Sequence, residues 1–339
     1  METYSILERS DGGEAVYELV DRGTGSSASI VPGIGAQCAR YVRSFRGRPV
    51  DILAGPEHLS DLRNNPVLYG NPILFPFPNR IKGGVFEFGG KRVQLPAGDG
   101  LGNAIHGLVL SRSWAVKAKG ASEAEGAWIT CVFDWADHPD LGSLWPFPFA
   151  IEYTYRLRDG RLESSVRASN TGSEPMPMGF GVHPWFPVPL TSAGSRASCR
   201  LKAPVDRVWE LDRLVPTGVV RDAAPERALR AGIALGDLEL DDVYAGLNEG
   251  LAPGEFSESV YHDPGCGIEI AVRADASFRE LVVYAPGLRP VVCLEPYTCT
   301  TDAFNLSAWG VDSGTIVLAP GESWAGEIVY EPRPAAPGA

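Results

Sequence analysis

Apolar and polar positions alternate most strictly between residues 149 and 168. One parity of the segment 149–158 carries large apolar side chains, and the other carries Ala150, Glu152, Thr154, Arg156 and Arg158. Asp159-Gly160 then favours a two-residue turn, and the alternation resumes from Leu162. A period of two over two adjacent segments predicts an antiparallel hairpin with one buried face and one face in water.

The rest of the chain shows the same kind of pattern in shorter pieces. Its 39 glycines and 28 prolines separate short runs of β-type residues. One short helix is expected between Pro56 and Asn65. The pattern predicts an all-β protein, a large antiparallel β-sandwich with few short helices. The strands are expected near 15–22, 27–31, 36–45, 48–53, 85–88, 91–95, 113–119, 126–136, 149–158, 162–168, 198–203, 205–211, 267–273, 279–285, 290–294, 314–318 and 323–330.

The domain organisation is predicted to be simple. No linker rich in Pro, Ser or charge interrupts the chain, and no repeat of fixed period is visible. We therefore expect a single domain over residues 1–331. The segment 332–339 is composed mainly of small residues and is expected to be a disordered tail.

Two loops rich in proline and aromatic residues stand out, at 70–81 and 176–189. Proline cannot donate a ladder hydrogen bond, so these stretches do not read as central strands. Stiff loops of this kind can hold a polar side chain in a fixed place. The first would position Arg80, and the second would position His183.

The segment 291–297 begins as a buried strand and then carries Glu295 immediately before Pro296. We expect the proline to weaken pairing, so that Glu295 lies at the strand's end. Its neighbours Cys293, Leu294 and Tyr297 would partly desolvate the carboxylate, which raises its pKa and makes it a better base. The alternative is an ordinary glutamate at the rim of the sheet, held in an ion pair.

Composition and charge exclude several classes of partner. The formal net charge is −12, which disfavours nucleic acid and anionic membrane surfaces. The first residues show no signal-peptide pattern, and no apolar run reaches membrane-spanning length. The six cysteines and five histidines have no metal-site spacing. We expect a cytoplasmic protein with free thiols and with neither metal nor cofactor.

Five polar residues lie at predicted strand ends or in stiff loops: Arg80, His106, His183, Asp241 and Glu295. Taken singly, each of these residues could have a purely structural role, such as a surface ion pair, a turn cap or a core histidine. Together they offer a base, proton donors and groups that hold hydroxyls. Trp185 and Phe186 follow His183 and could pack on the C–H face of a pyranose. The set suits a sugar.

With these residues, the chain resembles the aldose 1-epimerase (galactose mutarotase) family. The matching motifs occur in the family's order between about residues 20 and 330. They are Asn79-Arg80-Ile81 with the Phe88-Gly89-Gly90 hairpin, Asn103-Ala104-Ile105-His106-Gly107, His183-Pro184-Trp185-Phe186, Asp241 with Tyr244, Glu295-Pro296, Asp302-Ala303-Phe304-Asn305 and Leu318-Ala319-Pro320-Gly321-Glu322.

The resemblance implies a galactose mutarotase-like supersandwich with the sugar in an open cleft on one sheet. It makes Glu295 the base and His183 the acid of an anomer interconversion. It makes Arg80, His106 and Asp241 sugar-binding residues, with Asn79 and Trp185 as further candidates. Asp241 fits the family's spacing better than Asp242. The expected partner is a small sugar, and the chain would be a monomer or a homodimer.

Three positions depart from the familiar galactose-type motifs: Leu108, Pro187 and the pair Pro296-Tyr297. They bear on which sugar is preferred, as in a bacterial subgroup. Three other readings remain open. They are glycoside hydrolysis by Glu295 and Asp241, a hexose-6-phosphate mutarotase, and a non-catalytic sugar-binding protein of the same fold.

Overall fold

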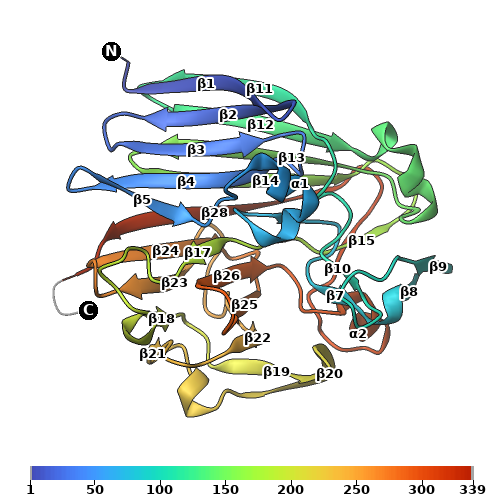
Figure 1. Ribbon diagram of the computed structural model, residues 1–339. Coiled ribbons are helices and arrows are strands. Elements are labelled where there is room, and N and C mark those ends of the chain that lie inside the picture. The colour runs from blue at the N-terminus through green and yellow to red at the C-terminus, as the bar shows by residue number, and fades with distance from the viewer. Residues whose placement is uncertain (1, 337–339) are drawn as a thin grey trace.

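The computed structural model describes residues 2–336 and is built almost entirely from antiparallel strands (Figure 1). The N-terminal part forms a five-stranded sheet in simple sequence order, in which each strand pairs with the next. Its strands are β1 (Tyr4–Asp11), β2 (Glu14–Asp21), β3 (Ser26–Val31), β4 (Gln37–Phe45) and β5 (Arg48–Leu53).

A nine-stranded sheet runs the length of the molecule in the order β11-β12-β13-β14-β28-β24-β23-β18-β21. The predicted hairpin lies in it, with Asp159 and Gly160 both at positive φ in the turn, as a tight hairpin requires. The strands are β11 (Ala115–Ser122), β12 (Gly126–Asp134), β13 (Phe149–Arg158), β14 (Arg161–Asn170), β18 (Arg200–Lys202), β21 (Ile233–Ala234), β23 (Phe256–Asp263), β24 (Ile268–Asp275) and β28 (Ser323–Pro334).

An eight-stranded sheet follows the order β20-β19-β22-β25-β26-β16-β6, and β17 also pairs with β26. Strand β26 therefore lies well inside this sheet, between β25 on one side and the short strands β16 and β17 on the other. The strands are β6 (Ile73–Leu74), β16 (Gly181–Val182), β17 (Trp185–Pro187), β19 (Arg207–Asp212), β20 (Val215–Asp222), β22 (Leu240–Ala245), β25 (Glu280–Ala285) and β26 (Val291–Tyr297).

Short elements complete the described chain. Three two-stranded pairs join β7 (Arg80–Ile81) to β10 (Ala104–Ile105), β8 (Val85–Phe88) to β9 (Lys91–Gln94) and β15 (Met176–Met178) to β27 (Ile316–Leu318). The helices are α1 (Leu59–Asn64) and α2 (Ala303–Ala308), with 3₁₀ turns at Pro66–Leu68, Lys82–Gly84, Trp135–Asp137, Pro139–Ser143, Arg196–Ser198 and Pro225–Arg227. Within residues 2–336, no helix has the length and apolarity to cross a bilayer.

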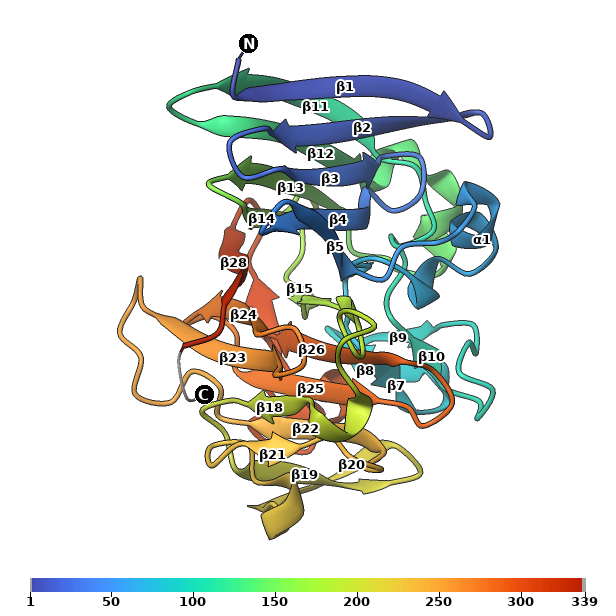
Figure 2. The same ribbon diagram turned by 60° about the vertical axis from the view of Figure 1, so that its left-hand side comes forward.

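The nine-stranded sheet is shared by two sandwiches (Figures 1 and 2). Its β11–β14 end packs against the five-stranded sheet, since β1 and β2 contact β11, β12 and β13. Its other end packs against the eight-stranded sheet, where Phe186 of β17 lies 6.5 Å, between ring centroids, from both Tyr261 of β23 and Tyr330 of β28. One continuous apolar core joins both halves. The predicted large antiparallel β-sandwich is confirmed.

Two sequence predictions need correction here. Strand β28 runs to Pro334, and Pro332, Arg333 and Pro334 pair with β24, so pairing extends into the expected tail 332–339. Beyond Tyr330, strand β28 has passed the end of β14 and pairs with β24 alone. Ala335 also donates a hydrogen bond to the carbonyl of Gly267. Residues 337–339 lie outside the described chain.

The second correction concerns Glu295, which was expected at a strand's end. Strand β26 continues through Pro296 to Tyr297, and Pro296 stands opposite Leu281 of β25. The amide of Thr298 points to the β16 side, where it bonds the carbonyl of Phe180. Alternation places the nitrogen of Pro296 on that same side, where the partner strands are interrupted between Val182 and Trp185. The proline therefore costs no bond to β25.

Strands β1, β20, β22 and β23, together with several strands of two or three residues, were not predicted. Strand β1 has a mostly exposed burial pattern, so its sequence carries no apolar alternation. It is held instead by eight register pairs with β2. An exposed strand of this kind is invisible to a hydrophobic pattern and is specified by its neighbour.

Candidate active site

A cavity of about 220 Å³ opens on one face of the eight-stranded sheet. All seven residues that the sequence singled out as catalytic or substrate-binding line it. The complete lining comprises Val67, Leu68, Asn79, Arg80, Gly98, Ile105, His106, His183, Trp185, Asp241, Val282, Tyr284 and Glu295. Residues from widely separated parts of the chain therefore meet in one concave site.

Strand register explains how the floor of the cavity is built. Asp241 on β22 stands opposite Tyr284 on β25, which stands opposite Cys293 on β26. Cys293 in turn stands opposite Trp185 on β17, so one row crosses four strands. The next position on β26, two residues on, is Glu295, opposite Val282. Side chains at alternate positions share a face, so these residues point the same way.

Glu295 is the most unusual member of this floor. Its side chain is 1% exposed, although ionised carboxylates are rarely buried to that degree without a cationic partner. Burial raises its pKa well above the usual range, and a hydrogen bond from Tyr297 opposes that rise. The Tyr297 hydroxyl donates to Glu295 Oε2 at 2.5 Å. Burial thus favours the protonated form of this carboxyl group.

Tyr297 is itself locked in place. A Cβ atom at position 181 would collide with its ring, so only Gly181 lets the tyrosine pack against β16. The ring is completely buried, and burial together with the nearby Glu295 charge raises the pKa of its hydroxyl. The hydroxyl thus remains a hydrogen-bond donor over the whole physiological pH range.

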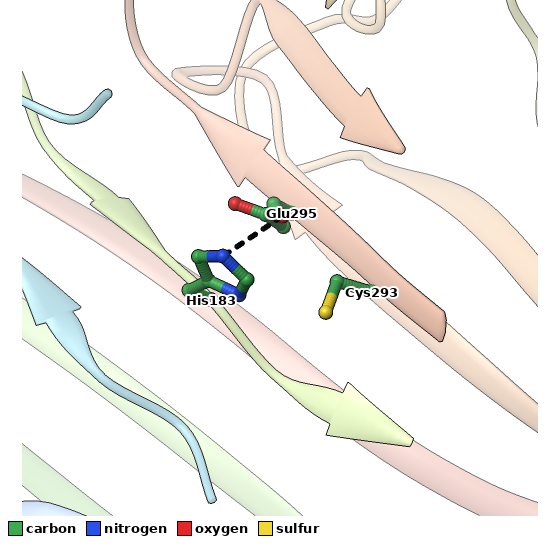
Figure 3. Close-up of side chains that lie close together, drawn as sticks. All are labelled: His183, Cys293 and Glu295. Carbon is green, nitrogen blue, oxygen red and sulfur yellow. Dashed lines mark ion pairs between the residues drawn. The ribbon is translucent and has the colours of Figure 1, made fainter. Parts of the chain in front are cut away.

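His183 faces Glu295 across the interruption between β16 and β17 (Figure 3). Its Nε2 lies 3.4 Å from Glu295 Oε1. The imidazole stacks on Trp185 with ring centroids 4.7 Å apart and planes 13° apart. Burial, together with the positive charge of Arg289, lowers the pKa of His183 to about 3. The unliganded imidazole is therefore neutral.

The two pKa shifts have a joint consequence. A neutral His183 with a protonated Glu295 and a charged His183 with an ionised Glu295 hold the same number of protons. The pair is thus a one-proton unit, and moving that proton converts one form into the other. Burial favours the neutral form, and polar groups that enter the cavity would favour the charged form.

Arg80 lies on β7 at the cavity wall, oriented by neighbouring polar groups. Its Nε donates to Asp99 Oδ2 at 3.0 Å and its Nη1 donates to Asn79 Oδ1 at 3.1 Å. Burial alone would raise the pKa of Asp99, but hydrogen bonds led by those from Asn103 lower it to about 2. Asp99 is therefore a permanent anion that holds Arg80.

His106 reaches the cavity from an unusual backbone conformation, with φ at 63°. Its amide donates to the carbonyl of Asn79 at 2.8 Å, and any side chain at Gly107 would collide with the backbone of Phe75. Its ring lies edge-on to His183 with centroids 5.4 Å apart. Burial, together with the charges of His183 and Arg80, lowers the pKa of His106 well below its usual value.

The adjacent residues Asp241 and Asp242 point to opposite faces of β22. Asp241 lines the cavity, whereas Asp242 forms an ion pair with Arg227 on the other face of β22. Burial raises the pKa of Asp241, and the charge of Arg80 opposes that rise. The structure therefore brings Asp241, and not Asp242, to the other predicted residues.

Trp185 and Phe186 differ from the expectation that both would offer a face to a sugar. Phe186 points into the core between Tyr261 and Tyr330. Trp185 lines the cavity but is only 2% exposed, stacked on His183 and contacted by the Arg289 guanidinium 4.6 Å from its ring centroid. Strand alternation sends the two side chains to opposite faces. Trp185 supports His183, and little of its face is free.

Sequence reasoning did not assign Asp99, Tyr284 or Tyr297 to the site. Tyr297 could have been found from parity, because it lies two positions after Glu295 on β26, whereas Tyr284 lies on β25 and depends on cross-strand register. Asp99 carries no such signal, since it sits in an irregular loop and acts only through Arg80. His183, Cys293 and Glu295 have metal-binding atoms within 4.8 Å of one another.

Together, the sandwich fold and this cavity define a small-molecule site with a buried imidazole–carboxyl pair on its floor and polar side chains on its walls. The aldose 1-epimerase family model matches residues 17–331. The chain belongs to the aldose 1-epimerase family.

Known proteins agree with this assignment. A galactose mutarotase-like protein from Clostridium acetobutylicum is 25% identical, with a TM-score of 0.88 over 98% of this chain and 99% of its own. The GalM/aldose epimerase homologue from C. elegans is 18% identical, with a TM-score of 0.76 over 98% and 100% of the two chains. An uncharacterized protein, YihR, from Escherichia coli K12 is 23% identical over 85% of this chain and 86% of its own length.

Proposed function

We propose that the protein is an aldose 1-epimerase, a mutarotase that interconverts the α and β anomers of a cyclic aldose. The observation that carries the proposal is the buried pair of His183 Nε2 and Glu295 Oε1, 3.4 Å apart on the floor of the cavity. Mutarotation needs one group that removes a proton and one that supplies it. A one-proton pair supplies both roles.

In the proposed reaction the bound sugar shifts the pair to its charged form. Glu295 takes the proton of the C1 hydroxyl while His183 gives its proton to the ring oxygen, and the C1–O5 bond breaks. The open-chain aldehyde then rotates about C1–C2, and the two transfers reverse on the other face of the carbonyl. The substrate changes neither composition nor oxidation level, so atoms and electrons balance within the sugar and the pair.

Tyr297 and Asp99 act as positioning residues in this scheme. The hydroxyl of Tyr297 stabilises the ionised form of Glu295, which is the form that removes the proton. Asp99 fixes the side chain of Arg80 against the cavity wall. Neither needs to touch the sugar to affect turnover.

The walls supply groups suited to sugar hydroxyls. Arg80 and Asn79 can donate, Asp241 can accept, and His106 can do either. The Nδ1 atom of His106 is buried without a hydrogen-bond partner among residues 2–336. Trp185 is proposed to contribute its edge and to hold His183. These assignments follow from the residues' places in the cavity.

The rival readings receive less support. Glycoside hydrolysis needs a second carboxyl group opposite the first, whereas Glu295 faces His183. A phosphosugar needs a cluster of cationic groups. Arg80 is the one lysine or arginine that lines the cavity in the described chain, and its Nε is already bonded to Asp99.

A polarimetric screen tests the proposal and distinguishes it from non-catalytic sugar binding. Single anomers of several aldoses, including neutral, uronic, sulfonated and 6-phosphorylated sugars, are dissolved in the presence of catalytic amounts of protein. We expect a faster approach to anomeric equilibrium for at least one of them, and no net hydrolysis of matched glycosides. Binding of every tested sugar without acceleration would leave a sugar-binding protein and refute the proposal.

A further inference from the structure

We propose that His183, Cys293 and Glu295 form a binding site for a thiolate-seeking divalent ion of the Zn²⁺ type, and that the bound ion inhibits the enzyme. The inhibition rests on the proposed function, because it requires His183 and Glu295 to be the proton-transfer pair. The binding of the ion does not depend on the reaction.

The three side chains converge from two neighbouring segments (Figure 3). Cys293 and Glu295 are two residues apart on β26, so both project from the same face of the strand. His183 approaches that face from the gap between β16 and β17. No spacing within the sequence announces this site, because its members come from segments more than a hundred residues apart.

The donor atoms lie close to the separation that a zinc ion requires. Bonds of about 2.0–2.3 Å in a tetrahedral site place donor atoms roughly 3.5 Å apart. The imidazole, thiol and carboxyl donors here all lie within 4.8 Å of one another. A side-chain movement of about 1 Å therefore completes three ligands. The fourth position would face the cavity and accept water or a sugar oxygen.

The chemistry of the set selects the ion. One nitrogen, one sulfur and one oxygen donor suit Zn²⁺ or Co²⁺, whereas Mg²⁺ and Ca²⁺ require oxygen ligands. As metal ligands, Cys293 would serve as a thiolate, Glu295 as a carboxylate and His183 as a neutral imidazole. The dication, a thiolate and a carboxylate then sum to zero charge. A neutral complex can be buried without the penalty of an uncompensated charge.

A second observation points to a ligand at this place. Glu295 Oε1 and His183 Nδ1 are both buried without a hydrogen-bond partner within the described chain. Buried polar atoms left unpaired are costly, so a ligand that bonds these two atoms would be stabilised there. Of the six free cysteines, Cys293 alone belongs to a group of this kind among residues 2–336.

Cys293 is also separable from the proposed reaction. It does not line the cavity, although its row neighbours Tyr284 and Trp185 do, and it takes no part in the proposed proton transfers. Cys293→Ser removes the soft donor and changes the volume little. Cys266→Ser is the matched control, because Cys266 is a partly exposed thiol outside the group.

Titration of the intact protein with Co²⁺, followed by displacement with Zn²⁺, is the test. We expect one equivalent of Co²⁺ to produce a thiolate-to-metal charge-transfer band that Zn²⁺ abolishes. Cys293→Ser should lose the band and bind Zn²⁺ at least about tenfold more weakly, whereas Cys266→Ser should match the wild type. Zn²⁺ should also suppress mutarotation in the wild type more than in Cys293→Ser.

The outcomes separate the two proposals. A charge-transfer band that depends on Cys293, in a protein that accelerates no anomerisation, would support the metal site and refute the enzyme. Mutarotation in a protein that binds no Co²⁺, or binds it without the band, would support the enzyme and overturn the metal site. Mutarotation by Cys293→Ser at the wild-type rate shows that the variant is folded. If the variant does not fold, the band in the wild type and its loss in His183→Gln decide the question.

Discussion

The hairpin β13–β14 and the strand β26 are built from the same backbone geometry but follow different rules. Strand β13 alternates between buried and half-buried positions along its whole length, and each buried position is apolar. Strand β26 is buried at all seven positions and still contains Glu295 and Pro296. The hairpin keeps all its charged side chains on its wetter face, whereas β26 places a carboxyl group and a proline inside a fully buried strand. That carboxyl group, Glu295, lines the cavity.

The same contrast holds for two stacked histidines. His138 stacks on Phe133 with ring centroids 4.1 Å apart, and His183 stacks on Trp185 at 4.7 Å. Only His183 faces a buried carboxyl group. Similar packing thus serves structure in one region and a proton-transfer pair in the other.

The largest expected effect is that of His183→Gln. Without the imidazole no group gives a proton to the ring oxygen, so kcat for anomer exchange should fall by about 10²–10⁴-fold. Polarimetry on the best sugar measures it. The matched control His138→Gln also removes a stacked imidazole, but it should leave kcat unchanged. Equal losses in both variants would show that the contrast between the two regions is wrong.

The hairpin should respond through stability instead. Ile151 is fully buried on β13, and Ile151→Ala should lower the free energy of unfolding by about 2–5 kcal/mol through the lost contacts and the resulting cavity. Denaturant unfolding measures this change. Activity per folded molecule should stay at the wild-type value. A comparable drop in kcat under conditions where the variant is fully folded would contradict a purely structural hairpin.

Tyr297→Phe removes one hydrogen bond to a charged group, which is worth about 1.5–3 kcal/mol. The bond favours ionised Glu295, so its loss should lower kcat by roughly 10–100-fold. It should also raise the pKa of Glu295 further and shift the alkaline limb of the pH–rate profile to higher pH. A lower rate with an unmoved limb would mean that Tyr297 only fills space.

The smallest effects are expected from substituting two glutamates outside the cavity, Glu280 and Glu152, and these effects concern stability. Burial raises the pKa of Glu280 to about 8, while the Trp209 indole donates to it at 3.0 Å. The folded state holds this proton more tightly than the unfolded state, so stability falls as pH rises from about 4.5 to about 8. Glu280→Gln keeps an acceptor for Trp209 and should abolish that fall.

Thermal unfolding at pH 5 and pH 9 checks this prediction. The variant should gain most over the wild type at pH 9. Glu152→Gln on β13 is the control, since Glu152 is a partly exposed partner of Lys117 and should change stability by less than about 0.5 kcal/mol at either pH. An identical pH dependence in wild type and Glu280→Gln would show that Glu280 titrates normally in the folded protein.

The two regions also differ in how well the sequence predicts them. The alternation from Phe149 to Leu157 and the Asp159-Gly160 turn are sufficient to predict the hairpin. One face of these strands is in water, so apolar and polar residues alternate with a period of two. Strand β26 has no wet face, so its sequence cannot show where it ends. The proline rule predicted an end at Glu295, and the gap between β16 and β17 removed the reason for one.

The sequence allowed the residues of the site to be predicted, but not their arrangement in space. Arg80, His106, His183, Asp241 and Glu295 were all recognisable and all line the cavity. Their distances, and the contributions of Tyr297 and Asp99, depend on cross-strand register and loop packing. The raised pKa of Glu295 was expected from its neighbours, but the lowered pKa of His183 was not, since it follows from the nearly complete burial of the imidazole.

Glu295→Gln gives the most direct test of the central claim. Magnetisation exchange between the α and β anomers at equilibrium, followed by NMR, reports turnover, and sugar titration of the same samples reports binding. The account predicts that Glu295→Gln binds the sugar and exchanges its anomers at least about 10²-fold more slowly than the wild type. Exchange at the wild-type rate by a variant that still binds the sugar would contradict it.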